Sequence, residues 1–147
     1  GRQFKIFKFR TMEKMKLTPK EIKELNEKSK IVFKSKKDPR ITKFGSFLRK
    51  SSIDELPQLI NVLKNEMSFI GPRPPIPEEV LKYEIKHLKR VSVKPGITGL
   101  WQGTLRQDND FDKWVEKDIE YIDNWSIFLD IKIALKTFKE IINLSGD

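Results

Sequence analysis

The sequence contains no cysteine and only one histidine, His87, among its 147 residues. Disulfide bonds, thiolate catalysis and cysteine metal sites are therefore excluded. His87 lies in a polar stretch of helical character and is interpreted as an exposed residue, so neither a catalytic triad nor a histidine-rich metal centre is expected. Any acid–base or metal chemistry must use carboxylates, which favour hard cations such as Mg²⁺.

Long apolar runs are also missing. No stretch of 18 apolar residues is present that would span a bilayer, and no secretory signal peptide is visible. The chain opens on "GRQFKIFKFRTM", with strand-like alternation already under way and no initiator Met. It is therefore interpreted as part of a longer protein.

Acidic residues are scarce in the first third of the chain. Residues 1–50 hold 17 Lys and Arg but 5 Asp and Glu, whereas residues 51–147 hold 13 and 16. This basic excess suggests an anionic partner, which is a nucleic acid, an acidic lipid or a phosphorylated substrate. The alternative is a solvated lysine-rich face that has no partner.

The pattern of apolar residues predicts an α+β fold, a mostly helical single domain with a few short strands. A strand is predicted over residues 3–12, and a turn at Pro95-Gly96 leads into another short strand. The most clearly amphipathic helix carries an apolar stripe that is interpreted as core rather than membrane-facing. Helices are predicted over residues 19–29, 41–50, 55–64, 77–89 and 111–124 and within the run 125–144.

Two adjacent carboxylates, Asp54 and Glu55, stand just before Pro57. A structural interpretation is that Pro57 belongs to the first turn of a helix and Asp54 caps it. A functional interpretation is that the helix start, with Arg49 and Arg73 on either side, holds a pyrophosphate bridged by Mg²⁺. A carboxylate then attacks phosphorus to give an acyl phosphate. Spacing alone leaves both interpretations open.

Five blocks of the sequence together resemble the bacterial sugar transferase family, the monotopic polyprenyl-phosphate phosphoglycosyl transferases. They occur in the family's order and extend from Phe4 to about Ile133, so the resemblance covers nearly the whole chain. One departure follows the Trp-Gln pair at residues 101–102, where Leu105 stands in place of a glycine that is common in the family. The blocks are "KIFKFRTM", "DPRITKFGSFLRKSSIDELPQLINVL", "MSFIGPRPP", "VKPGITGLWQ" and "YIDNWSIFLDIKI".

The resemblance implies an enzyme, a phosphoglycosyl transferase that moves a hexose-1-phosphate from a UDP-sugar to undecaprenyl phosphate and so starts polysaccharide or glycan assembly. It implies that Asp54 is the nucleophile of a covalent phosphosugar intermediate and that Glu55 supports the metal or moves protons. The implied cofactor is Mg²⁺, held by Asp54 and Glu55. The residues that match the family's phosphate-binding positions are Lys8, Arg10, Arg49, Arg73 and Arg106.

The family also implies a membrane location, the cytoplasmic face of the bacterial plasma membrane. A hydrophobic re-entrant segment is expected to precede Gly1 and to dip into the cytoplasmic leaflet, so that residues 1–147 form the catalytic domain. A shallow interfacial face on amphipathic helices is expected as well, with core packing as the alternative for its apolar residues. The candidates for this face are Phe44, Phe47 and Leu48, with Lys43 and Lys50 toward anionic lipid.

A second hypothesis is a basic nucleic-acid-binding module, for which the only motive is the charge of residues 1–50. The sequence contains no recognisable docking motif for nucleic acid, and its positive charge is mostly scattered lysine. The family resemblance therefore favours the transferase, without nucleic acid as a partner. The sequence names neither the sugar nor the oligomeric state, because discrimination between hexoses depends on a few pocket contacts.

Overall fold

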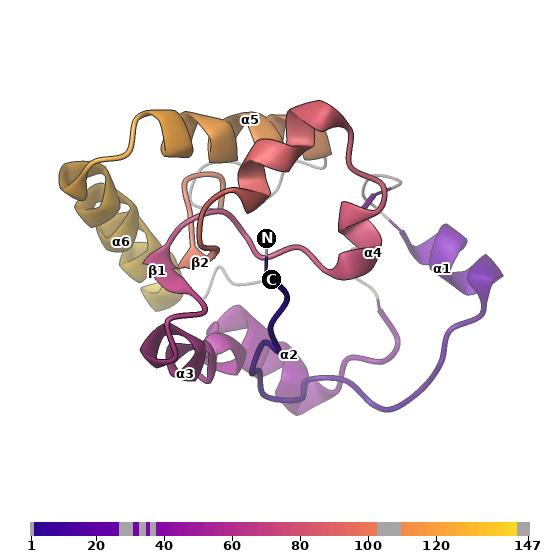
Figure 1. Ribbon diagram of the computed structural model, residues 1–147. Coiled ribbons are helices and arrows are strands. Elements are labelled where there is room, and N and C mark those ends of the chain that lie inside the picture. The colour runs from indigo at the N-terminus through magenta and orange to yellow at the C-terminus, as the bar shows by residue number, and fades with distance from the viewer. Residues whose placement is uncertain (1, 27–30, 33–34, 36–37, 103–109, 144–147) are drawn as a thin grey trace.

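The computed structural model describes residues 2–26, 31–32, 35, 38–102 and 110–143. Helices predominate and surround two short strands (Figure 1), which confirms the predicted α+β class. None of the described helices is both long and apolar enough to cross a bilayer. In chain order the elements are α1 (Pro19–Leu25), α2 (Lys43–Lys50), η1 (Ile53–Glu55), α3 (Gln58–Leu63), β1 (Ser68–Ile70), α4 (Pro77–Val80), η2 (Ile85–Val91), β2 (Gly96–Thr98), α5 (Phe111–Asp123) and α6 (Ile127–Ile142).

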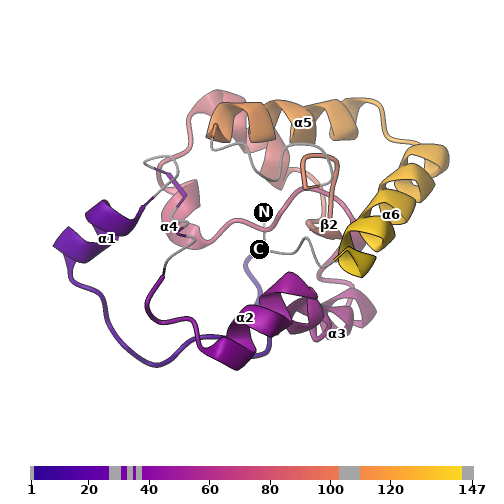
Figure 2. The same ribbon diagram turned by 180° about the vertical axis from the view of Figure 1, so that it is seen from behind.

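The elements are arranged around the small sheet. Helix α5 lies along one end of the molecule, α2 and α3 lie at the opposite end, and α6 runs between these two ends (Figures 1 and 2). Helix α1 lies on the side away from α6 (Figure 2). This arrangement brings α6 close to the segment that carries the two adjacent acids.

The sheet consists of β1 and β2, which pair in parallel with Ser68 opposite Gly96 and Ile70 opposite Thr98. Parallel strands need a long connection, and here it contains α4 and η2. The two backbones approach so closely that a Cβ added at Gly96 would lie 2.1 Å from the backbone nitrogen of Gly71. The short strand predicted after Pro95 is confirmed, and glycine at position 96 permits its pairing.

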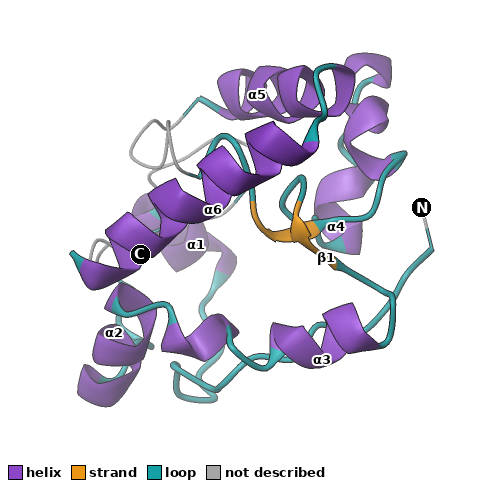
Figure 3. Ribbon diagram, turned by 90° about the vertical axis from the view of Figure 1, so that its left-hand side faces the viewer, coloured by secondary structure: helices purple, strands orange, loops and turns teal. Residues whose placement is uncertain are grey.

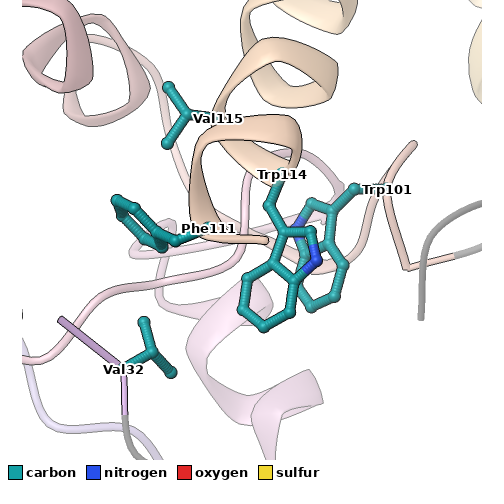
Figure 4. Packing of buried hydrophobic residues seen from close by; sticks show 5 residues of the cluster. All are labelled: Val32, Trp101, Phe111, Trp114 and Val115. Carbon is teal, nitrogen blue, oxygen red and sulfur yellow. The ribbon is translucent and has the colours of Figure 1, made fainter. Parts of the chain in front are cut away.

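The main hydrophobic core lies between α5 and the loop after β2. The rings of Trp101 and Trp114 stack with centroids 4.4 Å apart and an interplanar angle of 12°. Figure 4 shows this stack with Phe111 and Val115 of α5 and with Val32 from the segment after α1. A second, smaller cluster consists of Ile70, Tyr121 and Ile133.

The strand predicted over residues 3–12 is wrong. The segment is extended, but its one bridge of strand type joins Met12 to Ile41. Its backbone bonds instead to a side chain, because Phe7 N donates to Oδ1 of Asn61 over 3.1 Å. The alternation of apolar residues correctly indicated extended backbone, but no strand among the described residues forms a ladder with it.

Two predicted helices are each divided in two. The helix expected over 55–64 is a 3₁₀ turn, η1, followed by α3, which begins at Gln58 directly after Pro57, the N-cap residue that has no N–H to donate. The helix expected over 77–89 is α4 followed by the 3₁₀ helix η2. The second part restarts where Glu84 N donates to Nδ1 of His87 over 3.0 Å.

Other helix predictions are confirmed at their starts. Thr18 caps α1 through a capping box with Glu21, and the helix is exposed as expected; residues 27–29 of the prediction lie outside the described residues. Helix α5 ends one residue before the predicted limit. Helix α2 begins after Thr42, whose hydroxyl accepts a hydrogen bond from Gly45 N over 2.9 Å.

The interpretation of the C-terminal stripe as core is wrong. Along the described helix α6 only Ile133 is buried, while Ile127 is 61%, Leu135 67% and Phe138 65% exposed. Helical spacing predicts that a helix has an apolar face but does not say what covers it. The apolar face of α6 is therefore left at the surface of the described chain.

His87 is not an exposed residue, as the sequence suggested, but is 1% exposed. Its Nε2 lies 2.9 Å from Oδ1 of Asp112, and Nδ1 accepts from Glu84 N. Its ring also packs edge-on against Phe111 and Tyr83. The polar neighbours in sequence gave no sign of this burial, because the contacts come from α5, about 25 residues away.

A buried ion pair joins η2 to α5. Nε of Arg90 donates to Oδ2 of Asp118 over 2.6 Å, and both side chains are at most 3% exposed. Arg90 also donates to the Tyr83 hydroxyl over 2.9 Å. The other carboxylate oxygen, Oδ1 of Asp118, is buried and has no hydrogen-bond partner among the described residues. Burial raises the pKa of Asp118 to about 6, against the opposing effect of Arg90.

The contact between α2 and the N-terminal segment gives a first prediction. A Cβ at Gly45 would lie 2.0 Å from the carbonyl oxygen of Thr11. We expect Gly45→Ala to lower the free energy of unfolding by about 1–3 kcal/mol in urea denaturation, because the segment must move. Ser46→Ala, on the same helix, is the matched control and should change it little. A Gly45→Ala protein as stable as the parent would contradict this packing.

Candidate active site

Asp54 and Glu55 lie together in η1, a single 3₁₀ turn between α2 and α3. Ser52, two residues before Asp54, has a φ of 56°, so the chain turns sharply after α2. The N-cap position of α3 is Pro57, and no side chain caps that helix. The interpretation of Asp54 as a helix cap is therefore wrong, and its carboxylate does not serve that helix.

The N-terminal segment runs across this turn. Phe9 N donates to the carbonyl oxygen of Asp54 over 3.0 Å. Nζ of Lys8 donates to Oε1 of Glu55 over 2.7 Å, and both side chains are partly exposed. The structure thus brings Lys8, one of the predicted phosphate-binding residues, to the two acids across 47 positions of sequence.

Arg49 approaches the same turn from the last turn of α2. Its Nε donates to Oγ1 of Thr11 over 3.0 Å, which fixes the guanidinium against the N-terminal segment. Its positive charge acts on Asp54, as does that of Lys8. Asp54, Glu55, Lys8 and Arg49 therefore form one cluster, which we call the acid–base cluster.

The electrostatics of this cluster centre on Asp54. Burial raises the pKa of Asp54 above its usual value, and the neighbouring carboxylate of Glu55 raises it further. Lys8 and Arg49 act in the opposite direction and favour the charged form. Partial desolvation of a carboxylate beside two cations suits a nucleophile that must approach an anionic phosphate.

The other predicted phosphate-binding residues are placed differently. Arg73 lies after β1, and its Nη1 is 3.6 Å from Oε2 of Glu79. Among the described residues its charge acts on Tyr83 and Asp118 rather than on the acid–base cluster. Arg10 is exposed on the N-terminal segment. Arg106 lies outside the described residues.

Sequence reasoning missed the residues that hold the N-terminal segment in place. Asn61 is fully buried, accepts from Phe7 N through Oδ1, and donates through Nδ2 to the carbonyl oxygen of Lys5 over 2.8 Å. Thr11 holds Arg49, as described above. A signal for Asn61 was available, because a polar residue interrupts the apolar run "LINVL".

A cavity of about 120 Å³ adjoins the acid–base cluster. It lies between the η1–α3 segment on one side and β2 with the C-terminal half of α6 on the other, and Figure 3 shows α6 running toward α2. Residues that line it include Glu55, Leu56, Leu59, Thr98, Thr137 and Ile141.

The metal-binding capacity of the described residues is limited. No group of three or more His, Asp or Glu side chains among them is arranged to hold a metal ion. Asp54 and Glu55 are nevertheless adjacent carboxylates in one turn. Mg²⁺ commonly takes one or two protein carboxylates and completes its shell with phosphate oxygens and water, so this donor pair fits the ion when a phosphorylated substrate is present.

A sequence model of the family described as bacterial sugar transferase matches residues 1–144. The chain belongs to the bacterial sugar transferase family. This confirms the family assigned from the five sequence blocks, and nothing in the match supports a nucleic-acid-binding module.

Curated relatives agree with the family. The chain is 48% identical over 151 residues to galactosyl transferase CpsE of Streptococcus agalactiae, an alignment that covers 99% of this chain and 34% of that protein. It is 42% identical to undecaprenyl-phosphate galactose phosphotransferase of Salmonella typhimurium, covering 99% and 32%. With exopolysaccharide production protein ExoY of Rhizobium meliloti it shares 40% identity, covering 96% and 65%. The chain therefore spans about a third of the first two proteins and 65% of the third.

Proposed function

We propose that the protein containing this chain transfers a hexose-1-phosphate from a UDP-sugar to undecaprenyl phosphate. The names of relatives support both substrates, including the UDP-glucose:undecaprenyl-phosphate glucose-1-phosphate transferase of Escherichia coli, which is 41% identical over 153 residues. The observation that carries the proposal is the state of Asp54. It is a partly buried carboxylate with a raised pKa, flanked by Glu55 and within reach of the charges of Lys8 and Arg49.

In the first step Asp54 is the nucleophile. A carboxylate oxygen attacks the phosphorus that bears the hexose, and a bond forms between that oxygen and phosphorus. The bond from phosphorus to the oxygen bridging the two phosphates breaks, and its electron pair leaves with UMP. The product is an aspartyl phosphosugar, and no proton needs to move if the carboxylate is already ionised.

The cations of the cluster assist this step. The Asp54 carboxylate and the phosphate it attacks are both negatively charged and repel each other. The positive charges of Lys8 and Arg49 beside Asp54 reduce this repulsion. Arg49 suits the oxygens of a phosphate because its guanidinium is a planar fork of donors, held here by Thr11. Arg10, Arg73 and Arg106 stay predicted phosphate-binding residues.

In the second step the lipid phosphate resolves the intermediate. An oxygen of undecaprenyl phosphate attacks the same phosphorus, and the bond to Asp54 breaks. The electron pair returns to the Asp54 carboxylate, which is regenerated for another cycle. Both steps exchange one phosphorus–oxygen bond for another, so the barrier is lowered by charge neutralisation and by orientation of the reactants.

We further propose Mg²⁺ as the cofactor, with Asp54 and Glu55 as its protein ligands. The ion would neutralise charge on the diphosphate of the donor. Glu55 lies directly beside Asp54 in η1, which supports this role, and its partner is the Lys8 ammonium. A second role for Glu55, the movement of protons, is compatible with the same position.

Removal of divalent ions is the second prediction. We expect excess EDTA to lower the rate of UMP release from a UDP-sugar roughly 10²-fold or more, because charge on the diphosphate is no longer neutralised. Added Mg²⁺ should restore the rate, and added K⁺ at equal ionic strength should not. A full rate in EDTA, after the enzyme has been freed of bound metal, would contradict the metal role.

We propose that the domain acts at a membrane surface, on the cytoplasmic face of the plasma membrane. The exposed apolar side chains support this. Phe44 and Phe47 of α2 are 68% and 53% exposed, with ring centroids 6.4 Å apart. Leu48 was predicted to share their face but is buried, so it belongs to the interior. Apolar residues on short helices beside lysines are typical of interfacial binding.

The test of the proposed function uses the full-length protein in membranes with Mg²⁺, undecaprenyl phosphate and a panel of UDP-hexoses. We expect UMP release with one of them, together with a radiolabelled sugar in the lipid fraction. UMP without a labelled lipid product would contradict the acceptor, and no UMP with any UDP-sugar would contradict the donor.

A further inference from the structure

The cavity beside the acid–base cluster has mainly apolar walls. Leu56 and Leu59 form one side, and Ile141 of α6 forms part of the other. The threonine hydroxyls that border it, those of Thr98 and Thr137, hydrogen bond each other with their Oγ1 atoms 2.8 Å apart. The two threonine hydroxyls therefore have a partner within the wall. Ser52, Gln102 and two acids also line the cavity, but most of its surface is apolar, which favours an apolar occupant.

The charged side chains that line the cavity are both acids and do not favour a phosphate inside it. Glu55 and Glu140 both line it, and carboxylates repel an anion at short range. Of the reactants in the proposed function, the UDP-sugar is polar or charged throughout. The lipid acceptor is the one reactant with an uncharged apolar part, and that part is joined to the phosphate that must reach Asp54.

The two helices that contribute to the cavity also carry exposed apolar side chains. On α3, Ile60 is 46% and Leu63 87% exposed. On α6, Phe138 lies three residues before Ile141 and is 65% exposed. A long apolar chain that starts in the cavity can therefore meet further apolar side chains on these two helices.

We propose that this cavity holds the isoprene units nearest the phosphate of the polyprenyl phosphate acceptor. This inference rests on the proposed function. Glu55 borders the cavity and adjoins Asp54 in η1, so a chain seated there has its phosphate beside the phosphosugar on Asp54. One phosphate oxygen then forms the bond to phosphorus while the bond to the Asp54 carboxylate breaks, and the carboxylate leaves with the electron pair. At about 120 Å³ the cavity takes only the start of the chain, and the rest extends toward the lipid.

The test separates the two half-reactions in the full-length enzyme in membranes. Ile141→Trp fills the cavity from α6. We expect the amount and rate of UMP released in a single turnover without acceptor to stay within about twofold of the parent, because that step does not use the cavity. We expect the apparent KM for undecaprenyl phosphate to rise about tenfold or more, because apolar contact with the chain is lost.

Two controls accompany this variant. Lys132→Trp adds the same bulk on the opposite side of α6, given 100° per residue, and should leave the KM for undecaprenyl phosphate unchanged. Methyl phosphate, an acceptor without a chain, should be used equally by the parent and by Ile141→Trp. Leu59→Trp fills the cavity from the other wall and replaces Ile141→Trp if circular dichroism shows that the latter is unfolded.

The outcomes distinguish this inference from the proposed function. No UMP from the parent enzyme overturns both. UMP release with an unchanged KM for undecaprenyl phosphate in a folded Ile141→Trp or Leu59→Trp enzyme overturns the cavity alone. A folded variant that changes its oligomeric state while the KM stays unchanged shows a second copy in the cavity and also overturns the inference. A folded variant that loses the first half-reaction shows that the cavity serves that step and likewise overturns it.

Discussion

Asp54→Asn is expected to lower steady-state turnover by at least about 10³-fold, because an amide cannot form the acyl phosphate through which both steps pass. The change keeps the size of the side chain, and Asp54 is only partly buried, so the fold should be retained. The measurement is UMP release and labelled lipid product in full-length enzyme, with circular dichroism to show that the protein is folded.

Asp123→Asn is the matched control for this prediction. Asp123 is an exposed acid at the end of α5 that pairs with Lys89, and loss of such a pair costs little. Activity should therefore stay close to that of the parent. An Asp54→Asn enzyme that retains full turnover would refute the assignment of the nucleophile, whatever the fate of the control.

The second large effect concerns stability and the buried pair of Arg90 and Asp118. Asp118→Asn leaves the guanidinium of Arg90 buried without a counter-charge, since Tyr83 supplies only a neutral hydroxyl. We expect a loss of about 3–5 kcal/mol in the free energy of unfolding, measured by urea denaturation at pH 8. Asp123→Asn removes an exposed acid of the same helix and should cost less than about 1 kcal/mol.

A double variant sharpens this prediction. Arg90→Met with Asp118→Leu removes both charges together and should be far closer to the parent than Asp118→Asn is, because desolvation of the pair is costly in itself. Equal losses in the single and double variants would contradict a coupled pair.

The sequence was informative where local chemistry decides the structure. The capping box of Thr18 and Glu21 predicted the start of α1, and the apolar spacing predicted α5 almost to the residue. Pro57 marked the start of a helix, although the residues before it form a separate 3₁₀ turn. The two acids of that turn could be recognised from the sequence, because Asp54 and Glu55 are adjacent and stand just before Pro57.

Contacts between distant segments could not be predicted. The alternation in residues 3–12 indicates extended backbone, but the partner of that backbone is Asn61 rather than a strand. The burial of His87 depends on its contact with α5. The apolar stripe of α6 is exposed because no described element covers it. The candidate active site also depends on a contact between distant segments, because Lys8 reaches Glu55 only where the N-terminal segment crosses η1.

Covalent capture tests the central claim most directly. Full-length enzyme is mixed with the UDP-sugar that it uses, without acceptor, and is analysed by intact-protein and peptide mass spectrometry under acid quench. The account predicts one hexose phosphate per protein, located on Asp54, released when undecaprenyl phosphate is added and absent from the Asp54→Asn protein. An enzyme that turns over fully yet never carries this adduct, or carries it on another residue, would contradict the account.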